Sequence, residues 1–213
     1  MHKFKNRFLD EIEDEQLSDR QKTYIQAKKL IQIENIDEES VVVDIGSNFG
    51  EVIRALTDTG CRIYSFEPHP LFYNILKEEY SDRERVFLFD SAVWTCNQKR
   101  NFYFKNSPTS LNGGATLMAE KSNILNLNLN VKVTCLDIAE VVDALEFVDV
   151  LKMDVEGAEY ELLDRLYETG VYKKVKSIYF EDHSRKMESA RFFNLKQKVI
   201  TNYSESDKEL YWW

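Results

Sequence analysis

The chain has 213 residues, 43% of them hydrophobic and 31% charged, which is typical of a globular protein with one sizeable core. Its formal net charge of -9 argues against a nucleic-acid partner, because binding to a phosphate backbone needs a basic surface. The three scattered cysteines (Cys61, Cys96 and Cys135) form no C-x-x-C pair, so they indicate neither a zinc site nor a disulfide framework and favour a reducing, cytoplasmic compartment.

The first 40 residues are polar and rich in helix-forming types. Apolar side chains recur between positions 5 and 35, which predicts one or two amphipathic helices, and Ser18 and Asp19 can cap the second. The basic N-terminus is not followed by the apolar segment of a signal peptide, and no run reaches the length of a transmembrane helix. We therefore expect a helical extension over residues 1–40, no membrane span, and an α/β domain over residues 41–213.

The first predicted strand, Val41–Ile45, runs into a glycine-containing turn that ends at Gly50, and a helix is predicted from Glu51 to Thr59. Similar turns occur in many α/β proteins that bind no cofactor. A dinucleotide-binding turn has the spacing G-x-G-x-x-G, which lets a pyrophosphate approach the helix. Here Ser47 stands where the second glycine would be. The turn therefore indicates a ligand with an adenosine ribose and no phosphates, of which S-adenosylmethionine is the obvious example.

The second predicted strand, Arg62–Phe66, strengthens that interpretation because it ends in an acidic residue, Glu67. Glu67 follows Gly46 by 21 positions, the separation expected of a carboxylate that binds ribose hydroxyls. A solvated glutamate at a strand end is the alternative. Two prolines, Pro68 and Pro70, then fix the entry to a helix predicted over residues 71–80.

The middle of the chain continues the alternation and then departs from it. A strand over Val86–Phe89 ends in Asp90-Ser91-Ala92, and Asn101–Phe104 alternates like one arm of a hairpin. A long loop rich in asparagine and serine follows over residues 106–130, and loops of that length often cover a site or bind a substrate. Val131–Leu136 is the next predicted strand, and Asp137 is expected to cap a helix.

The last third adds two more strands with polar ends. The predicted strand Val148–Val155 has Asp154 near its end. Glu156 and Gly157 follow it, and a helix is predicted over residues 158–167. Ser177–Phe180 ends in Glu181-Asp182-His183. The remaining segments are predicted as a helix over residues 185–193 and two strands, over residues 197–202 and 209–213.

Polar side chains thus gather at the strand ends, where open parallel sheets bind ligands. They are Asp44, Glu67, Asp90, Asp154, Glu156, Glu181, Asp182 and His183. So many carboxylates repel one another, which points to hydroxyl-rich and cationic ligands or to a metal. Asp154, Glu181 and Asp182 have the hard oxygen donors that Mg²⁺ prefers, but no sequence pattern identifies a metal site. His183 is either a solvated loop residue or a general base, and Asp154 is either a helix cap or a base.

Three segments together resemble the signature blocks of the FkbM family of S-adenosylmethionine-dependent methyltransferases. They are Asp44–Gly50, Phe66–Pro70 and Leu151–Glu159. The first block is shared with many class I methyltransferases, whereas the third, with Asp-Val-Glu-Gly-Ala-Glu after an apolar strand, is much more specific.

The resemblance implies a Rossmann-like class I methyltransferase sheet of seven strands, mostly parallel with an antiparallel last strand. It also implies transfer of a methyl group to a hydroxyl of a sugar, glycan or natural product. The predicted cofactor-binding residues are Asp44, Gly46, Ser47, Asn48, Phe49, Gly50, Glu67, Pro68, Asp90, Ser91 and Ala92. Asp154 and His183 are the predicted catalytic residues, and Glu156 and Glu181 the predicted acceptor-binding residues.

Two other functions are compatible with a sheet of this kind. A short-chain NAD(P)-dependent oxidoreductase is disfavoured because the chain lacks both G-x-G-x-x-G and a suitable Tyr-x-x-x-Lys pair. A non-catalytic binding module with the same fold is disfavoured by the acidic residues at the strand ends, which a site without chemistry would not need. The sequence does not identify the acceptor, a metal requirement or an oligomeric state.

Overall fold

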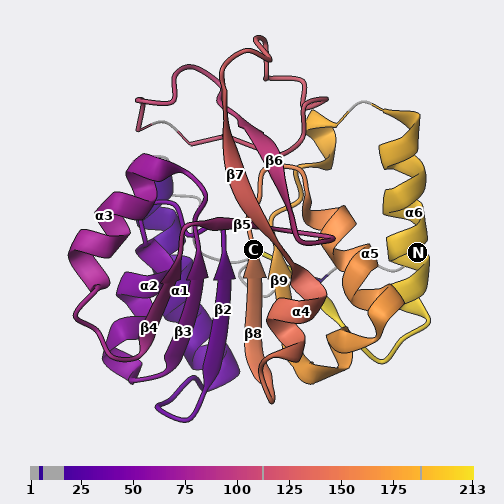
Figure 1. The fold of residues 1–213 in the computed structure, drawn as a ribbon. Helices are drawn as coiled ribbons and strands as arrows, with labels where there is room; N and C mark the ends of the chain where they lie inside the picture. The colour runs from indigo at the N-terminus through magenta and orange to yellow at the C-terminus, as the bar shows by residue number, and fades with distance from the viewer. Residues whose placement is uncertain (1–4, 7–16, 112, 188) are drawn as a thin grey trace.

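The computed structural model describes residues 5–6, 17–111, 113–187 and 189–213. Within these residues it contains a seven-stranded sheet in the order β1-β10-β9-β8-β2-β3-β4, in which every neighbouring pair is parallel (Figure 1). The strands of this sheet are β1 (Lys5–Asn6), β2 (Val41–Ile45), β3 (Arg62–Phe66), β4 (Val86–Phe89), β8 (Val148–Met153), β9 (Val175–Phe180) and β10 (Leu210–Trp212).

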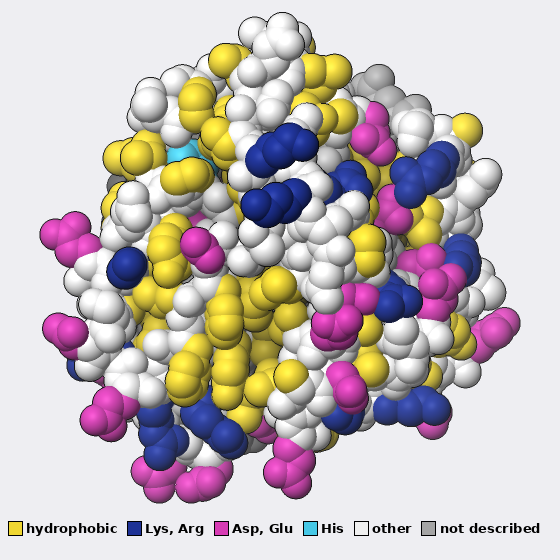
Figure 2. Space-filling model, in the orientation of Figure 1, with side chains coloured by type: hydrophobic (Ala, Val, Ile, Leu, Met, Phe, Trp, Pro, Cys, Tyr) yellow, Lys and Arg dark blue, Asp and Glu magenta, His cyan; other side chains and the backbone are white. Residues whose placement is uncertain are grey.

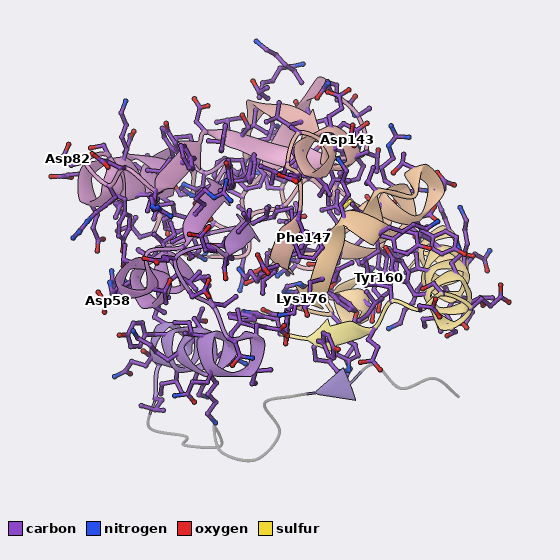
Figure 3. The ribbon with its side chains drawn as sticks, turned by 90° about the horizontal axis from the view of Figure 1, so that it is seen from below. Asp58, Asp82, Asp143, Phe147, Tyr160 and Lys176 are labelled. Atoms are coloured by element: carbon purple, nitrogen blue, oxygen red, sulfur yellow. The ribbon has the colours of Figure 1, made fainter. Side chains whose placement is uncertain are left out.

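The helices cover the sheet on both sides. They are α1 (Asp19–Glu34), α2 (Glu51–Leu56), α3 (Pro70–Tyr80), α4 (Ile138–Asp143), α5 (Glu159–Thr169) and α6 (Ala190–Ser204), with short 3₁₀ turns at Thr57–Thr59, Val171–Lys174 and Ser184–Lys186. Two apolar clusters result: one joins α1, α2 and α3 to one face, and the other joins α4, α5 and α6 to the opposite face. Figure 3 views the molecule from below and shows α1 and α4, whose end is marked by Asp143, on opposite sides of the strands. Because both faces are covered, every residue of β2 is buried, as expected for a central parallel strand.

The predicted antiparallel last strand is wrong. β10 pairs with β9 in parallel, with Leu210 opposite Ile178. The segment 197–202, predicted as a strand, lies inside the 15-residue helix α6. A helical crossover carries the chain back across the sheet before the next strand begins, so that strand must run parallel, whereas an antiparallel neighbour needs only a tight hairpin.

A smaller three-stranded sheet is inserted between β4 and β8. It has the order β5-β7-β6, with β5 at Ser91–Trp94, β6 at Gln98–Tyr103 and β7 at Asn130–Asp137. The predicted hairpin arm and the strand after it pair antiparallel as β6 and β7. The six-residue α4 then leads into β8, capped by Asp137, whose side chain accepts the Ala139 N–H as predicted. Hydrophobic side chains gather below this small sheet on the face shown in Figure 2.

The predicted helical extension contributes α1, which begins at the predicted cap. The Ser18 side chain accepts the Gln21 N–H, and the Gln21 side chain accepts the Ser18 N–H. Ala27 and Leu30 of this helix lie in the same apolar cluster as α2. The possible earlier helix falls mainly on residues outside the described part of the chain. Within the described residues no helix is long and apolar enough to cross a membrane.

Candidate active site

The loop between β2 and α2 is fixed by close contact with the loop after β8. Gly46 has φ +82°, and a Cβ atom at this position would lie 1.9 Å from the carbonyl oxygen of Asp154. The Asp154 N–H donates to the Ile45 carbonyl at 2.9 Å, which extends the pairing of β2 and β8 to this point. Only glycine tolerates both the backbone angle and the contact. The predicted cofactor loop and the third signature block therefore meet directly.

The rest of the loop packs against neighbouring elements. Gly50 caps α2 with φ +81°, and a Cβ atom there would lie 2.6 Å from the Leu76 side chain of α3. The Ser47 hydroxyl lies 2.6 Å from that of Ser65 on β3. The Phe49 ring lies 4.5 Å from that of Phe72, and the guanidinium of Arg20 in α1 lies over the Phe49 ring at 4.1 Å. Phe49 thus ties the loop to helices α1 and α3.

Glu67 joins this loop to the end of β3, as the sequence predicts. Its buried carboxylate accepts the Asn48 N–H and the His69 N–H, each at 2.7 Å. Burial raises the pKa of Glu67 to about 7, although both N–H groups oppose the shift. A carboxylate held in this way at the turn is positioned to accept ribose hydroxyls.

A cavity opens beside Glu67, between the large and the small sheet. Its polar wall includes Gly46, Asn48, Glu67, Pro68 and His69, and its apolar wall includes Phe66, Phe72, Ala92, Val93, Phe102 and Leu117. Of the three residues predicted to bind the cofactor after β4, Ala92 lines the cavity, whereas Ser91 does not and Asp90 is exposed to solvent. An apolar pocket with a polar rim suits a nucleoside, and we therefore call it the nucleoside cavity.

Asp44 lies beneath the loop rather than in the cavity wall. It is fully buried, and its carboxylate forms an ion pair with the Lys152 Nζ at 3.2 Å. Lys152 also donates to the Gly46 carbonyl at 3.1 Å and lies 3.9 Å from the Asp154 carboxylate. Burial alone would lower the pKa of Lys152, but Asp44 and Asp154 outweigh it and raise that pKa. Lys152 was not predicted as a site residue, although a lysine between Leu151 and Met153 in a buried strand is a signal visible in the sequence.

Asp154 follows β8 and faces both the nucleoside cavity and a second, more polar cavity. Its side chain is 27% exposed. Burial raises its pKa to about 7, and Glu181 adds to the shift while Lys152 and His183 oppose it. Near neutral pH this carboxyl group can therefore accept or release a proton.

His183 is enclosed by carboxylates. Its Nδ1 lies 2.8 Å from Glu159, and its Nε2 lies 3.3 Å from both Glu156 and Glu181. Burial alone would lower the pKa of His183, but the hydrogen bonds to Glu159 and Glu181 outweigh it and raise the pKa to about 10. At neutral pH the ring is therefore an imidazolium with both nitrogens protonated. Glu159, which the sequence analysis did not assign, also accepts the Val155 and Gly157 N–H groups.

Glu156 connects this cluster to the long loop. Its backbone has φ +58°, its carbonyl accepts the Thr116 hydroxyl at 2.8 Å, and its carboxylate pairs with the buried Lys121. Lys186 lies 3.5 Å from the same carboxylate. Burial alone would raise the pKa of Glu156, but His183 and Lys121 reverse this and lower it. Lys121 was also not assigned, because nothing in the sequence relates it to a glutamate 35 positions later.

The second cavity borders the first and shares part of its wall, including Gly46, Asn48, Asp154 and Glu156. Glu181, His183, Lys105, Lys152 and Lys186 also line it. Asp182 points elsewhere, because its carboxylate is held by Lys196 at 2.9 Å and by the Ser184 N–H at 2.8 Å.

Among the described residues, one group of side chains could hold a metal ion. It consists of Asp154, Glu159 and His183, whose donor atoms lie within 4.8 Å of one another. The arrangement does not suit a divalent cation. Both ring nitrogens of His183 carry protons and face carboxylates, so neither offers a lone pair. Both carboxylates of the group also have a cationic neighbour, because the Lys152 ammonium lies 3.9 Å from Asp154 and the His183 ring lies 2.8 Å from Glu159.

The parallel sheet, the glycine turn at the end of β2 and the carboxylate at the end of β3 define a Rossmann-like fold of the class I methyltransferase type. A family model for the FkbM methyltransferase domain matches residues 44–203. The chain belongs to this family of S-adenosylmethionine-dependent methyltransferases, and the predicted resemblance is confirmed.

Solved structures with a similar course of the chain include several methyltransferases. A precorrin-6y C5,15-methyltransferase from Geobacter metallireducens GS-15 is 13% identical, with a TM-score of 0.46 over 89% of this chain and 74% of that one. An O-methyltransferase from Thermotoga maritima is 11% identical, with a TM-score of 0.42 over 83% of this chain and 49% of that one. An RNA methyltransferase from Salinibacter ruber, in complex with S-adenosyl-L-homocysteine, is 13% identical, with a TM-score of 0.38 over 76% and 78%. No curated protein matches the chain.

Proposed function

We propose that the protein transfers the methyl group of S-adenosylmethionine to a hydroxyl oxygen of a sugar, glycan or other hydroxyl-rich small molecule, with Asp154 as the base. The observation that carries the proposal is the place of Asp154. It lies where the nucleoside cavity meets the polar cavity, and its pKa is raised to about 7.

The nucleoside cavity supports the cofactor part of the proposal. Glu67, which already accepts the Asn48 N–H, would accept the ribose hydroxyls, and the apolar wall with Ala92 and Phe102 would enclose the base. The cofactor supplies a methyl group already activated by its sulfonium. The carboxylate of Asp154, which lines both cavities, would lie near the cationic sulfonium of a cofactor bound in this way.

The polar cavity supports the acceptor part. Charged groups of both signs line it, and the apolar side chains in its lining are only Phe49 and Val52 among the described residues. Alternating donors and acceptors suit a molecule with many hydroxyls better than a large apolar one. The net charge of -9 remains a reason to expect an acceptor other than nucleic acid.

The two predicted catalytic residues, Asp154 and His183, have different roles in this proposal. The new bond joins the acceptor oxygen to the methyl carbon, the carbon–sulfur bond breaks with its electron pair on sulfur, and the acceptor proton passes to Asp154. His183 is already protonated, so we assign it to holding Glu156, Glu159 and Glu181 in place rather than to proton removal. The same contacts give Glu156 and Glu181 positions at the rim of the acceptor cavity. Alignment can lower the barrier of such a reaction by several kcal/mol, and a positioned base can add about 10²–10⁴-fold in rate.

Two experiments test the proposal. Calorimetric titration with S-adenosylhomocysteine and, separately, with NAD should show binding of the first alone. Incubation with S-adenosylmethionine labelled in the methyl group and a panel of sugars and glycans should then label an acceptor, and the label should survive mild alkali, as a methyl ether does. Binding of NAD alone would contradict the cofactor. Release of the label as methanol would indicate a carboxyl ester and contradict hydroxyl methylation.

A further inference from the structure

The small sheet and the loop beyond it form a basic part of an acidic chain. Residues 91–136 contain a single acidic residue, Glu120, although the whole chain has a net charge of -9. The basic residues of this segment are Lys99, Arg100, Lys105, Lys121 and Lys132. Lys121 is buried against Glu156, but the others form no ion pair within the described part of the chain. Positive charge that is not paired inside the molecule is free to attract an anionic partner.

The pairing of β6 with β7 places two of these lysines on one face of the small sheet. Asn101 lies opposite Lys132, and Lys99 precedes Asn101 by two positions, so the three side chains share a face. The other face belongs to the core, where Phe102 and Val133 are buried. Lys99 and Lys132 are exposed, and Figure 2 shows basic side chains over this sheet. We call the outer side of the sheet, with Lys99, Asn101 and Lys132, the basic face.

The loop between β6 and β7 exposes aliphatic side chains beyond the end of this sheet (Figure 1). Its exposed leucines are Leu111 at 50%, Leu125 at 88% and Leu127 at 53%. The same loop buries Leu117, Met118 and Ile124, so it has already supplied apolar side chains to the core. The exposed leucines are therefore in excess of what the fold uses, and such a group on one loop marks an interaction surface.

Hydrogen bonds give the end of this loop a defined shape. The Asn126 side chain accepts the Asn128 N–H at 3.0 Å, and the Asn126 carbonyl accepts the Leu129 N–H at 3.1 Å. The side chain of Asn130, the first residue of β7, donates to the Leu127 carbonyl at 2.7 Å. Residues 125–130, which we call the leucine turn, are therefore built directly onto the strand that carries Lys132.

We propose that the basic face and the leucine turn together dock on an anionic lipid bilayer. The lysines would contact the charged headgroups, and the leucines would enter the apolar layer beneath them. The acidic remainder of the chain would be repelled by the same surface, which orients the molecule with this side toward the lipid. A nucleic acid also offers phosphates, but it has no apolar layer for aliphatic side chains, and single strands are held by aromatic stacking.

Sedimentation with lipid vesicles tests the inference on the unaltered protein. The protein should bind vesicles of phosphatidylcholine with about one third phosphatidylglycerol at least about tenfold more tightly than vesicles of phosphatidylcholine alone. Raising the salt concentration from about 0.05 M to about 0.5 M should weaken that binding at least about tenfold, because salt screens exposed charges. Equal binding to both kinds of vesicle, or to neither, would overturn the inference.

Two double variants separate the charged and the apolar parts of the surface. Lys99→Gln with Lys132→Gln, and Leu125→Ser with Leu127→Ser, should each weaken binding to the anionic vesicles at least about tenfold. All four side chains are exposed, so both variants should fold and bind S-adenosylhomocysteine like the unaltered protein. Normal vesicle binding by either double variant would overturn the inference.

Matched controls change exposed side chains elsewhere. Phe193→Ser removes a 62% exposed ring from α6, and Lys77→Gln with Lys173→Gln removes two exposed lysines from other elements. These variants should bind the vesicles within about twofold of the unaltered protein. A labelled single-stranded RNA that binds the basic face when the vesicles do not would identify a nucleic-acid surface and overturn the inference. None of these outcomes bears on the proposed function.

Discussion

At the scale of single residues, the site is a set of carboxylates whose proton affinities are pushed in opposite directions. Glu67 and Asp154 have pKa values raised to about 7, whereas the pKa values of Glu156 and Glu181 are lowered. Burial acts on all four, and the difference comes from the cations: His183 outweighs burial at Glu156 and Glu181. The divergence bears on the roles, because a carboxylate whose pKa lies near neutral pH is a stronger base than one whose pKa is lowered and is still ionised often enough to accept a proton.

The first prediction concerns Asp154. Turnover of the unaltered enzyme should rise with pH and level off above about 7, because the carboxyl group must lose its proton before it can act as a base. Asp154→Asn should bind S-adenosylhomocysteine almost normally, lose at least about tenfold in kcat and lose this pH dependence. Asp182→Asn is the control, because that carboxylate pairs with Lys196 outside the site and should leave the pH limb in place. Normal turnover by Asp154→Asn would reduce the residue to a structural role.

The residues that sequence analysis identified differ in kind from those it missed. Asp44, Gly46, Glu67, Asp154 and His183 each stand at the end of a strand, and strand ends can be located from hydrophobic patterns alone. The residues that were not predicted are the cations Lys121 and Lys152 and the carboxylate Glu159. Their roles depend on the residues that they contact in the folded protein. Lys121 reaches Glu156 from an irregular loop, and no local pattern determines the course of such a loop.

At the scale of elements, the turn after β2 depends on one contact between loops. The second prediction is that Gly46→Ala destabilises the protein and abolishes cofactor binding, because its Cβ would lie 1.9 Å from the backbone of Asp154. Gly170→Ala is the matched control: its φ is +76°, but a Cβ there meets nothing within 4 Å. The control should cost about 1–2 kcal/mol for the backbone angle alone, and Gly46→Ala at least about 2 kcal/mol more. Equal losses in urea unfolding would show that the contact relaxes without cost.

The third prediction concerns the loop between β6 and β7. Lys121→Met leaves Glu156 with one fewer cation and should lower the free energy of unfolding by about 2–4 kcal/mol. Adding Glu156→Gln should cost less than the sum of the single changes, with a coupling of about 1–3 kcal/mol. Lys198→Met removes the ion pairs that the half-exposed ammonium of α6 makes with Asp164 and Glu168 of α5, and it should change stability by no more than about 1 kcal/mol. Additive losses at Lys121 and Glu156 would mean that their contact does not hold the loop.

The elements themselves were largely predictable, and the failure at the C-terminus has a physical reason. Strands β2, β3 and β4 carry β-branched and aromatic residues between clear turns, and their predicted ranges agree with the structure. The segment 197–202 contains valine, isoleucine and threonine, which favour strands, yet it lies in α6. Val199 and Tyr203 are buried one helical turn apart, and Tyr203 packs on Tyr167 of α5, so tertiary packing overrode local preference.

At the scale of the whole molecule, the buried charges make stability depend on pH in a definite direction. Glu67 and Asp154 have folded pKa values above their unfolded ones, so the folded state binds more protons and stability falls as pH rises from about 4 to about 7. His183 has a folded pKa of about 10 against an ordinary value of 6.5, so its contribution is complete below 6.5 and is lost as pH rises toward 10. The lowered pKa values of Glu156 and Glu181 act oppositely and remove stability in acid.

The fourth prediction follows from these signs. The melting temperature should be highest between about pH 5 and 6 and should fall continuously toward pH 10, with His183 accounting for a loss on the order of a few kcal/mol above pH 7. His183→Gln should therefore be less stable than the unaltered protein at pH 6, and the gap between the two should narrow as the pH approaches 10. Urea unfolding at a series of pH values measures both curves. A gap that stays constant with pH would show that folding does not shift the pKa of His183 from its ordinary value, and the carboxylates around it would then have to be held by Lys121 and Lys186 instead.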